Sequence, residues 1–241
     1  MVRGIYASGS GMITQSRKID VLSNNMANIS TPGFKRDNLE TRSFDEQLVY
    51  SLKSGERLGS ISYGEAPGKE TTNLTAGNFE QTGRSADLAI TSDGFFAVRG
   101  ANGTEYTRSC SFEVDAQGYL ALPTGQRLLG DNGEIRVGGD NFNVTEDGTV
   151  LNGGGVVGKI RLYNAGGAQT VKNADGLFTL NGAQPVNGTI WQGFIEDSNV
   201  GTVDEMTGLM ASSRTYQSCQ QAFDVSDQAE QMLVNQVAAL K

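Results

Sequence analysis

Both ends of the chain carry long heptad patterns without internal proline, and these patterns constrain the fold more than any other feature. The first pattern runs from residue 3 to about residue 30 and predicts one helix. Thr31-Pro32-Gly33 ends it, because the residue before a proline leaves the helical region and glycine permits a left-handed turn. Six of its eight seam positions are apolar; the eight are Ile5, Ser8, Met12, Gln15, Ile19, Leu22, Met26 and Ile29.

The C-terminal pattern begins at Thr202-Val203-Asp204-Glu205, which has the T-x-x-E form of a capping box and predicts the start of a helix. A helix running from there to residue 240 is too long and too narrowly striped for a small domain to cover. We therefore expect it to have a partner helix. Seven of its ten seam positions are apolar; the ten are Leu209, Ser212, Tyr216, Cys219, Phe223, Ser226, Glu230, Leu233, Val237 and Leu240.

Charge indicates which helix the partner is. Residues 1–36 carry five basic side chains and one acidic side chain, whereas residues 199–241 carry five acidic side chains and two basic ones. Opposite charge beside matched heptads predicts that the N- and C-terminal helices pair as a coiled coil, within a chain or between chains. Two separate amphipathic helices, each packed on a β body, remain the alternative.

The middle of the chain has the pattern of a β domain. Short β-prone runs alternate with turns from about residue 70 to residue 195, and the 32 glycines are roughly double the usual ~7% share. We expect positive backbone torsions at six turns, namely Asp93-Gly94, Asn132-Gly133, Asp147-Gly148, Asn152-Gly153, Asn181-Gly182 and Asn187-Gly188. The predicted fold is mixed α and β, with a central Gly-rich all-β domain between the two helices.

Four regions follow from these patterns. They are an N-terminal helix over 1–31, an extended connector or hairpin over 32–74, the β domain over 75–195, and the C-terminal helix over 196–241. In the connector, Phe44 and Leu48 stand as isolated apolar anchors among charged residues.

Composition argues against nucleic-acid binding, catalysis and metal binding. The net charge of −8 disfavours a nucleic-acid partner. The absence of histidine removes the commonest general base and metal ligand. Cys110 and Cys219 lack C-x-x-C spacing, and a carboxylate pair such as Asp140 and Glu146 is common in any acidic β protein. We therefore predict no catalytic residue, cofactor or metal site.

Nothing in the chain indicates membrane insertion either, because no apolar run reaches 18 residues. The N-terminus lacks the features of an ordinary secretory signal. The protein is expected either to stay inside the cell or to leave by another route.

Three asparagines near the end of the first helix, Asn24, Asn25 and Asn28, are unusual because asparagine is a mediocre helix former. One explanation is fraying near a helix cap. The other is hydrogen bonding of the amides to neighbouring backbones in a packed helical array.

These asparagines lie in the segment LSNNMANISTPGFK, residues 22–35, which closely resembles the N-terminal signature of bacterial flagellar rod and hook proteins. Three further segments match that family in order. They are GNFEQT with ADLAI and GFF over residues 77–96, YTR to LG over 106–130, and QGFIEDSNV from 192. Within the family, the modest length and the Thr31-Pro32-Gly33-Phe34 turn favour a proximal rod protein over a distal one. Ser109-Cys110-Ser111 departs from the small glycine-type residues common at that point.

The resemblance implies a non-enzymatic subunit of the flagellar basal-body rod. Such a subunit assembles helically around the export channel and transmits torque, with copies of itself and other rod and hook axial proteins as partners. The terminal helices then form an inner tube, the connector cross-links subunits, and the β domain forms the outer layer. Export through the flagellar type III apparatus, which cleaves no signal, is implied as well, and Phe44 with Leu48 resembles its gate-recognition element.

We therefore expect an assembly interface on the terminal helices, formed as folding is coupled to assembly. A secreted β-domain protein that binds or hydrolyses glycans, with helical oligomerisation ends, is the alternative. The expected interface residues are Ile5, Met12, Ile19, Leu22, Asn24, Asn25, Met26, Asn28, Ile29, Leu209, Tyr216, Phe223, Leu233 and Val237, with Thr31, Pro32, Gly33 and Phe34 as the turn into the connector.

Overall fold

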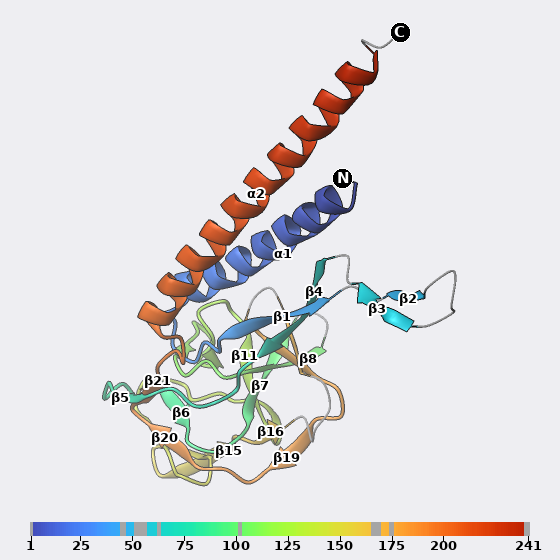
Figure 1. The fold of residues 1–241 in the computed structure, drawn as a ribbon. Coiled ribbons are helices and arrows are strands. Elements are labelled where there is room, and N and C mark those ends of the chain that lie inside the picture. The colour runs from blue at the N-terminus through green and yellow to red at the C-terminus, as the bar shows by residue number, and fades with distance from the viewer. Residues whose placement is uncertain are drawn as a thin grey trace. The chain divides into compact units, whose positions relative to one another are not determined.

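The computed structural model describes residues 2–43, 47–50, 57–61, 64–100, 103–164, 170–173 and 176–238. These residues contain one helix near each end and a β-rich region between them, so the mixed α and β class is confirmed (Figure 1). The chain forms two compact units. Unit 1 comprises Met1–Ala27, Asp37–Asn73 and Val200–Lys241, and unit 2 comprises Asn28–Arg36 and Leu74–Asn199.

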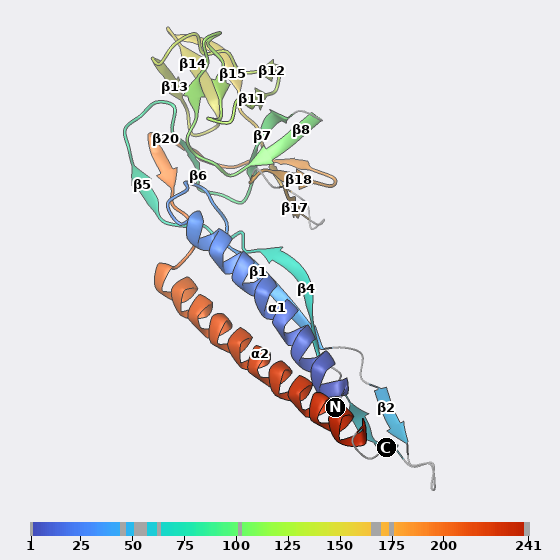
Figure 2. The same ribbon diagram turned by 90° about the horizontal axis from the view of Figure 1, so that it is seen from above.

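The two helices of unit 1, α1 (Val2–Ala27) and α2 (Thr202–Ala238), run side by side in opposite directions (Figure 2). Gly4 lies opposite Ser226, Gly11 opposite Cys219, and Leu22 opposite Gly208, which together define one continuous antiparallel register. The terminal helices therefore lie side by side within a single chain, and their packing as a coiled coil stays a prediction. Helix α1 ends at Ala27, a few residues before the expected end, because the chain then enters turns in which the Thr31 N–H donates to the Asn28 carbonyl.

The start of α2 differs in detail from the prediction. The N–H of Glu205 donates to the carbonyl of Gly201 at 3.0 Å, so Gly201 rather than Thr202 is the N-cap residue. Glu205 is buried, and its carboxylate faces Asn25 of α1. The predicted helix start is confirmed, since α2 begins at Thr202. The cap differs because Glu205 is buried against α1, a partner that the local sequence pattern does not contain.

The rest of unit 1 consists of two antiparallel pairs of strands. Strands β1 (Asp37–Ser43) and β4 (Glu65–Thr72) form a ribbon whose register shifts between Leu39 and Thr41, and β2 (Gln47–Tyr50) pairs with β3 (Arg57–Ile61). The ribbon lies along α1, where the Thr14 hydroxyl donates to the Glu65 carbonyl at 3.2 Å (Figure 2). Part of the expected connector is therefore a paired ribbon held by a helix.

Unit 2 holds the remaining strands, arranged as one ten-stranded sheet, one three-stranded sheet and two strand pairs among the described residues. The three-stranded sheet has the order β13-β14-β15, and the pairs are β20-β6 and β21-β5. The strands are β5 (Phe79–Gln81), β6 (Leu88–Ile90), β7 (Phe95–Gly100), β8 (Gly103–Thr107), β9 (Glu113–Val114), β10 (Leu120–Ala121), β11 (Arg127–Gly130), β12 (Gly133–Glu134), β13 (Phe142–Val144), β14 (Thr149–Asn152), β15 (Gly155–Lys159), β16 (Leu162–Asn164), β17 (Thr170–Lys172), β18 (Phe178–Leu180), β19 (Gln184–Val186), β20 (Ile190–Gln192) and β21 (Phe194–Glu196).

Strand β7 is the centre of the large sheet, since it pairs with β8, β11 and β16. Its run Phe95-Phe96-Ala97-Val98 is apolar at every position because both faces are covered. Phe96 packs edge-on against Phe112 in the main core, with ring centroids 5.3 Å apart, whereas Phe95 meets Phe178 in a second cluster at 5.0 Å.

The expected tight turns are only partly as predicted. Gly94, Gly133, Gly148, Gly153 and Gly182 have the positive φ values that the Asn-Gly and Asp-Gly pairs suggested, but Gly188 does not. At Gly188 an added Cβ would lie 2.1 Å from the Ser92 hydroxyl. This glycine serves a close approach of two segments, which a dipeptide pattern cannot distinguish from a turn.

Gly33 requires glycine for two reasons, a positive φ and a close approach of another segment. Its φ is +73°, its N–H donates to the Glu196 carbonyl at 2.7 Å, and an added Cβ would lie 2.2 Å from the Arg108 carbonyl oxygen. Gly83 has the same φ of +73° with nothing within 4 Å of its added Cβ, so it is a matched control.

We predict that Gly83→Ala lowers the free energy of unfolding of unit 2 by about 1–2 kcal/mol, the cost of a left-handed non-glycine residue. Gly33→Ala is expected to cost a further ~1–3 kcal/mol, because the backbone that it meets cannot move away freely. Urea unfolding followed by the emission of Trp191, the only tryptophan, measures both variants. Equal destabilisation by the two substitutions would contradict the packing argument.

Candidate assembly site

The seam between α1 and α2 includes small residues at three points where the helices approach closely. An added Cβ at Gly11 would lie 3.1 Å from Cys219 Sγ, and one at Gly4 would lie 3.4 Å from Ser226 Oγ. At Gly208 the nearest atoms are the two methyl groups of Leu22, at 3.5 Å. Glycine and other small residues therefore allow the helix backbones to approach closely along the whole of their shared length.

Most residues predicted for the helix seam are shielded from solvent. Leu22 and Asn25 are buried, and the other predicted seam residues whose exposure the structure describes are at least half-buried except Leu233, which is 44% exposed. Leu233 is exposed because the register places the start of α1 level with about residue 228 of α2. The half-buried residues are Ile5, Met12, Ile19, Met26, Leu209, Tyr216 and Phe223.

The remaining predicted residues are scattered. Asn24 is exposed on α1, whereas Asn28 and Ile29 are half-buried in unit 2. Leu48 lies in β2 opposite Ser60, and Val237 lies in the last turns of α2. Phe44 lies outside the described residues.

Asn25 forms a buried polar node in unit 1. Its Nδ2 donates to the Asp37 carbonyl at 2.8 Å, and its Oδ1 accepts from the Asp37 N–H at 3.0 Å. The same Nδ2 lies 3.4 Å from Glu205 Oε2. The Asn25 amide therefore bonds a backbone segment, as the second explanation for the asparagines predicted. That backbone belongs to Asp37 of the same chain.

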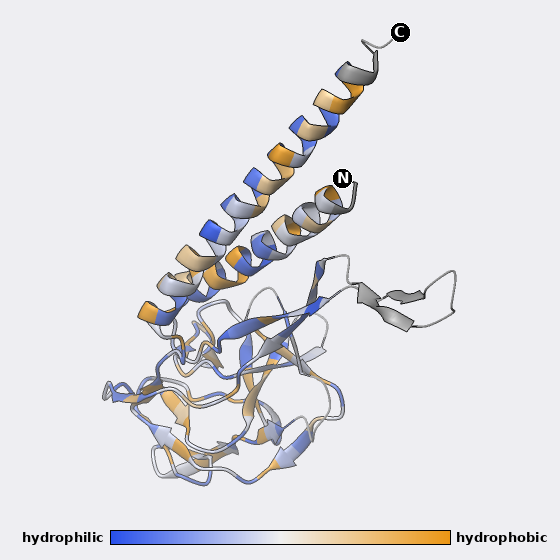
Figure 3. Ribbon diagram, viewed as in Figure 1, coloured by the Kyte–Doolittle hydropathy of each residue, from blue (hydrophilic) through white to orange (hydrophobic). Residues whose placement is uncertain are grey.

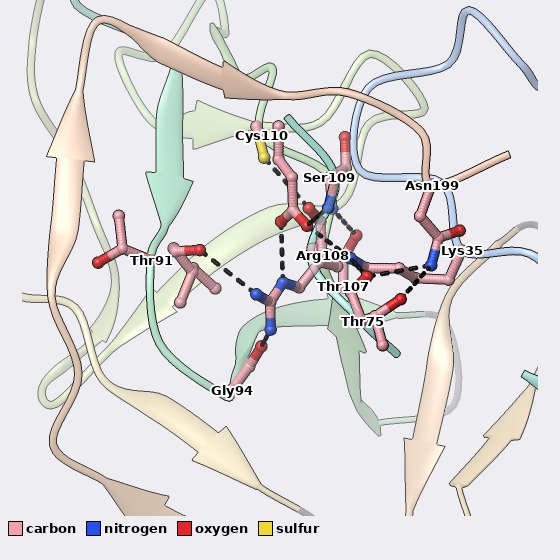
Figure 4. Close-up of polar contacts among 12 residues, drawn as sticks. Lys35, Thr75, Thr91, Gly94, Thr107, Arg108, Ser109, Cys110 and Asn199 are labelled. Carbon is pink, nitrogen blue, oxygen red and sulfur yellow. Dashed lines mark hydrogen bonds and ion pairs between the residues drawn. The ribbon is translucent and has the colours of Figure 1, made fainter. Parts of the chain in front are cut away.

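Unit 2 contains a buried ionic cluster that the sequence did not reveal (Figure 4). The carboxylate of Glu196, at the end of β21, contacts Lys35 Nζ at 2.5 Å and Arg108 Nε at 3.0 Å. The backbone N–H of Gly77 donates to the same carboxylate at 3.0 Å. Lys35 and Glu196 side chains are fully buried, so three distant segments meet at one carboxylate shielded from water.

The two cations of this ionic cluster, Lys35 and Arg108, also donate hydrogen bonds to backbone carbonyls. Lys35 Nζ donates to the carbonyl of Thr75 at 2.8 Å, and Arg108 donates to the carbonyls of Gly94 at 2.8 Å and Ile90 at 3.3 Å (Figure 4). Charges buried in this way stay favourable only when their hydrogen bonds are satisfied. The cluster therefore fastens loops and strand ends rather than presenting a reactive group.

The electrostatics of the cluster support a structural role. Burial by itself would raise the pKa of Glu196, but the hydrogen bond from Lys35, the charge of Arg108 and the Gly77 N–H hold that pKa below its ordinary value. Burial raises the pKa of the neighbouring Cys110 thiol to about 12. The thiol thus stays protonated and unreactive at neutral pH.

The predicted turn into the connector is held in unit 2 by Lys172 of β17. Its Nζ donates to the Lys35 carbonyl at 3.0 Å and lies 3.8 Å from the centre of the Phe34 ring. In this cation–π contact the positive charge of Lys172 is attracted to the face of the buried Phe34 ring.

Within the described residues, no three His, Cys, Asp or Glu side chains gather as metal ligands would. None of the helices there is both long enough and apolar enough to span a membrane.

Comparison with known proteins identifies the architecture. The model for flagella basal body rod proteins matches residues 5–35, and the model for the D1 domain of the flagellar hook proteins FlgE/F/G matches residues 89–152. The model for the C-terminal region of the flagellar basal body rod FlgEFG proteins matches residues 192–236. Together these matches define a structural protein of the flagellar hook and rod class.

Whole-chain relatives narrow this class. The flagellar basal-body rod protein FlgG of Bacillus subtilis is 30% identical, with 98% of this chain and 99% of the relative covered. The rod protein FlgF of Caulobacter vibrioides is 34% identical over 93% of each chain. The chain belongs to the flagellar basal-body rod protein family and is a component of the flagellum basal body. Because FlgG and FlgF relatives both match closely, the preference for the proximal position stays a prediction.

The ionic cluster gives a pH-dependent prediction. Because the folded pKa of Glu196 is lower than the unfolded pKa of about 4.3, its stabilisation is complete above about pH 5 and is lost as the pH falls below the unfolded pKa. Glu196→Gln is expected to lower the free energy of unfolding by about 3–5 kcal/mol at pH 7, since it leaves two buried cations without a counterion.

Urea unfolding of unit 2 between pH 3 and pH 7, followed by Trp191 emission, measures this effect. Glu80→Gln on the exposed face of β5 removes the same charge and is the control. A Glu196→Gln variant whose stability declines toward pH 3 as steeply as that of the unmodified protein would contradict the assignment.

Proposed function

We propose that this chain is a non-enzymatic structural subunit of the flagellar rod, assembling helically around the export channel with copies of itself and with other rod and hook axial proteins. The observation that carries this proposal is the distribution of apolar side chains on α1 and α2. Hydrophobic residues recur along both helices (Figure 3), and several of these apolar side chains remain exposed. The exposed apolar residues on the helices are Tyr6, Ile13, Val203, Met206, Met210, Val225, Met232, Leu233 and Val234.

In the proposed assembly, neighbouring subunits bury the apolar side chains that remain exposed on α1 and α2. Burying one such side chain contributes about 1.5–3 kcal/mol, so a row of them along a helix drives association strongly. Coiled-coil packing of these helices against those of adjacent copies buries the exposed residues in an inner tube. Asn25 and the glycine seam keep the two helices of one subunit together as a unit for this packing.

The other regions complete the role. The β1–β4 ribbon carries cross-links between subunits, and unit 2 forms the outer layer. The ionic cluster around Glu196 stiffens unit 2, which suits a part that transmits torque. Export through the flagellar type III apparatus, with Phe44 and Leu48 as its recognition element, belongs to the same proposal.

An exposed apolar side chain on the helices tests the proposal. Val225→Asp is expected to leave the monomer folded, because Val225 is 65% exposed, but to reduce incorporation into basal bodies by at least about tenfold, since a buried charge costs well over 1.4 kcal/mol. Basal bodies isolated from a strain that lacks its own copy, together with swimming in soft agar, measure incorporation.

Gln220→Glu adds the same charge to the same helix at an exposed position without removing an apolar side chain, and we expect it to incorporate normally. Normal rods built from the Val225→Asp protein would refute helix-mediated assembly.

The state of the helices before assembly is a separate prediction. In the monomer, amides of α2 near residues 208–226 are expected to exchange hydrogen at least about tenfold more slowly than those near 230–238, because only the first group faces α1. Hydrogen exchange resolved along the chain measures this difference. Equal, strong protection to the end of α2 would show that the helix does not depend on a partner there.

A further inference from the structure

Unit 2 exposes an aromatic patch at the junction of β5, β20 and β21. Trp191 is 40% exposed, although Phe79 and Phe194 flank it with ring centroids 5.8 Å and 5.4 Å away. These two rings hold the indole in one orientation without covering it. An exposed tryptophan fixed in this way is typical of a residue that another surface covers.

The neighbouring residue Gln192 fastens this patch to the edge of the three-stranded sheet. Its Oε1 accepts from the Val144 N–H at 2.9 Å, and its Nε2 donates to the Phe142 carbonyl at 3.0 Å. The amide therefore closes the outer edge of β13 against strand addition, so a partner at this edge must pack through side chains.

A shallow hollow of about 410 Å³ lies beside Trp191 and is lined in part by Asn143 and Glu146. Glu146 is exposed there. The aromatic patch, defined here as Phe79, Trp191 and Phe194, thus has an acidic side chain, Glu146, at its rim.

The opposite edge of the same sheet carries a second apolar surface. Strand β15 lies at the end of the order β13-β14-β15, with Val156 71% exposed and Val157 38% exposed. Lys159, the last residue of β15, is exposed beside them. An apolar edge strand of this kind is an aggregation hazard unless something covers it. We call Val156, Val157 and Lys159 the valine edge.

We infer that the aromatic patch of one copy of this chain packs against the valine edge of a second copy. The two surfaces differ and lie beside opposite edges of the β13-β14-β15 sheet, with the acidic Glu146 at the rim of one and the basic Lys159 in the other, so each copy carries both halves of the contact. A contact between two different surfaces is heterologous and continues from copy to copy instead of closing into a dimer. The inference rests on the proposed rod function and names a contact between the β units of neighbouring subunits.

The charges on the two rims give the sharpest test. In the assembled rod, Glu146→Lys and Lys159→Glu are each expected to reduce incorporation by about tenfold or more, because each places like charges across the contact. The double variant restores the opposite charges in exchanged positions and is expected to recover most of the incorporation. Arg136→Glu, at an exposed position of unit 2 that belongs to neither surface, makes the same charge change and is the control.

Isolated basal bodies measure incorporation, and the emission spectrum of Trp191 in each purified monomer confirms that unit 2 is folded. Single variants that incorporate normally would overturn the inference, as would a double variant no better than the single ones. If the unmodified chain itself fails to enter rods, the proposed function fails instead, so the two failures are distinguishable.

A second measurement tests whether the aromatic patch binds a glycan instead of a second copy of the chain. Titration of the dilute monomer with chitotetraose or cellotetraose is expected to leave Trp191 emission unchanged. A saturable shift with either oligosaccharide would assign the patch to glycan binding and overturn the inference of a contact between copies.

Discussion

The buried carboxylate of Glu196 is the interaction on which unit 2 depends. It forms ion pairs with both Lys35 and Arg108, which lie 161 and 88 residues away in sequence, and it accepts a backbone hydrogen bond from Gly77. The same residue accepts the Gly33 N–H through its main-chain carbonyl. A single residue therefore sets both the turn after Asn28 and the ends of β8 and β21, because a buried charge tolerates only a fully satisfied arrangement.

Unit 1 is held together mainly by close packing of helix backbones, whereas unit 2 depends on a buried ionic cluster. Glycine at positions 4, 11 and 208 lets α1 and α2 pack along one register, and Asn25 closes that register with bonds to Asp37 and Glu205. Apolar side chains remain exposed on both helices of this unit. Their exposure suits membership of the basal-body rod protein family.

Much of this architecture was predictable from sequence because it rests on periodicity. Heptads located both helices, and Asn-Gly and Asp-Gly pairs located five glycines with positive φ. The ionic cluster was not predictable, since no local pattern relates Lys35, Arg108 and Glu196. Glu205 was assigned to a helix cap and Gly188 to a turn for the same reason: each acts on a residue distant in sequence.

The sequence by itself determined the element types, the opposite charges of the two ends and, through four ordered motifs, the family. Only the tertiary structure decided that the helices pair within one chain, that Asn25 bonds Asp37, and that β13 and β15 offer different surfaces at the two edges of a sheet. The physical reason is that periodicity is a property of neighbouring residues. Register, burial and satisfied charge depend instead on segments that only folding brings together.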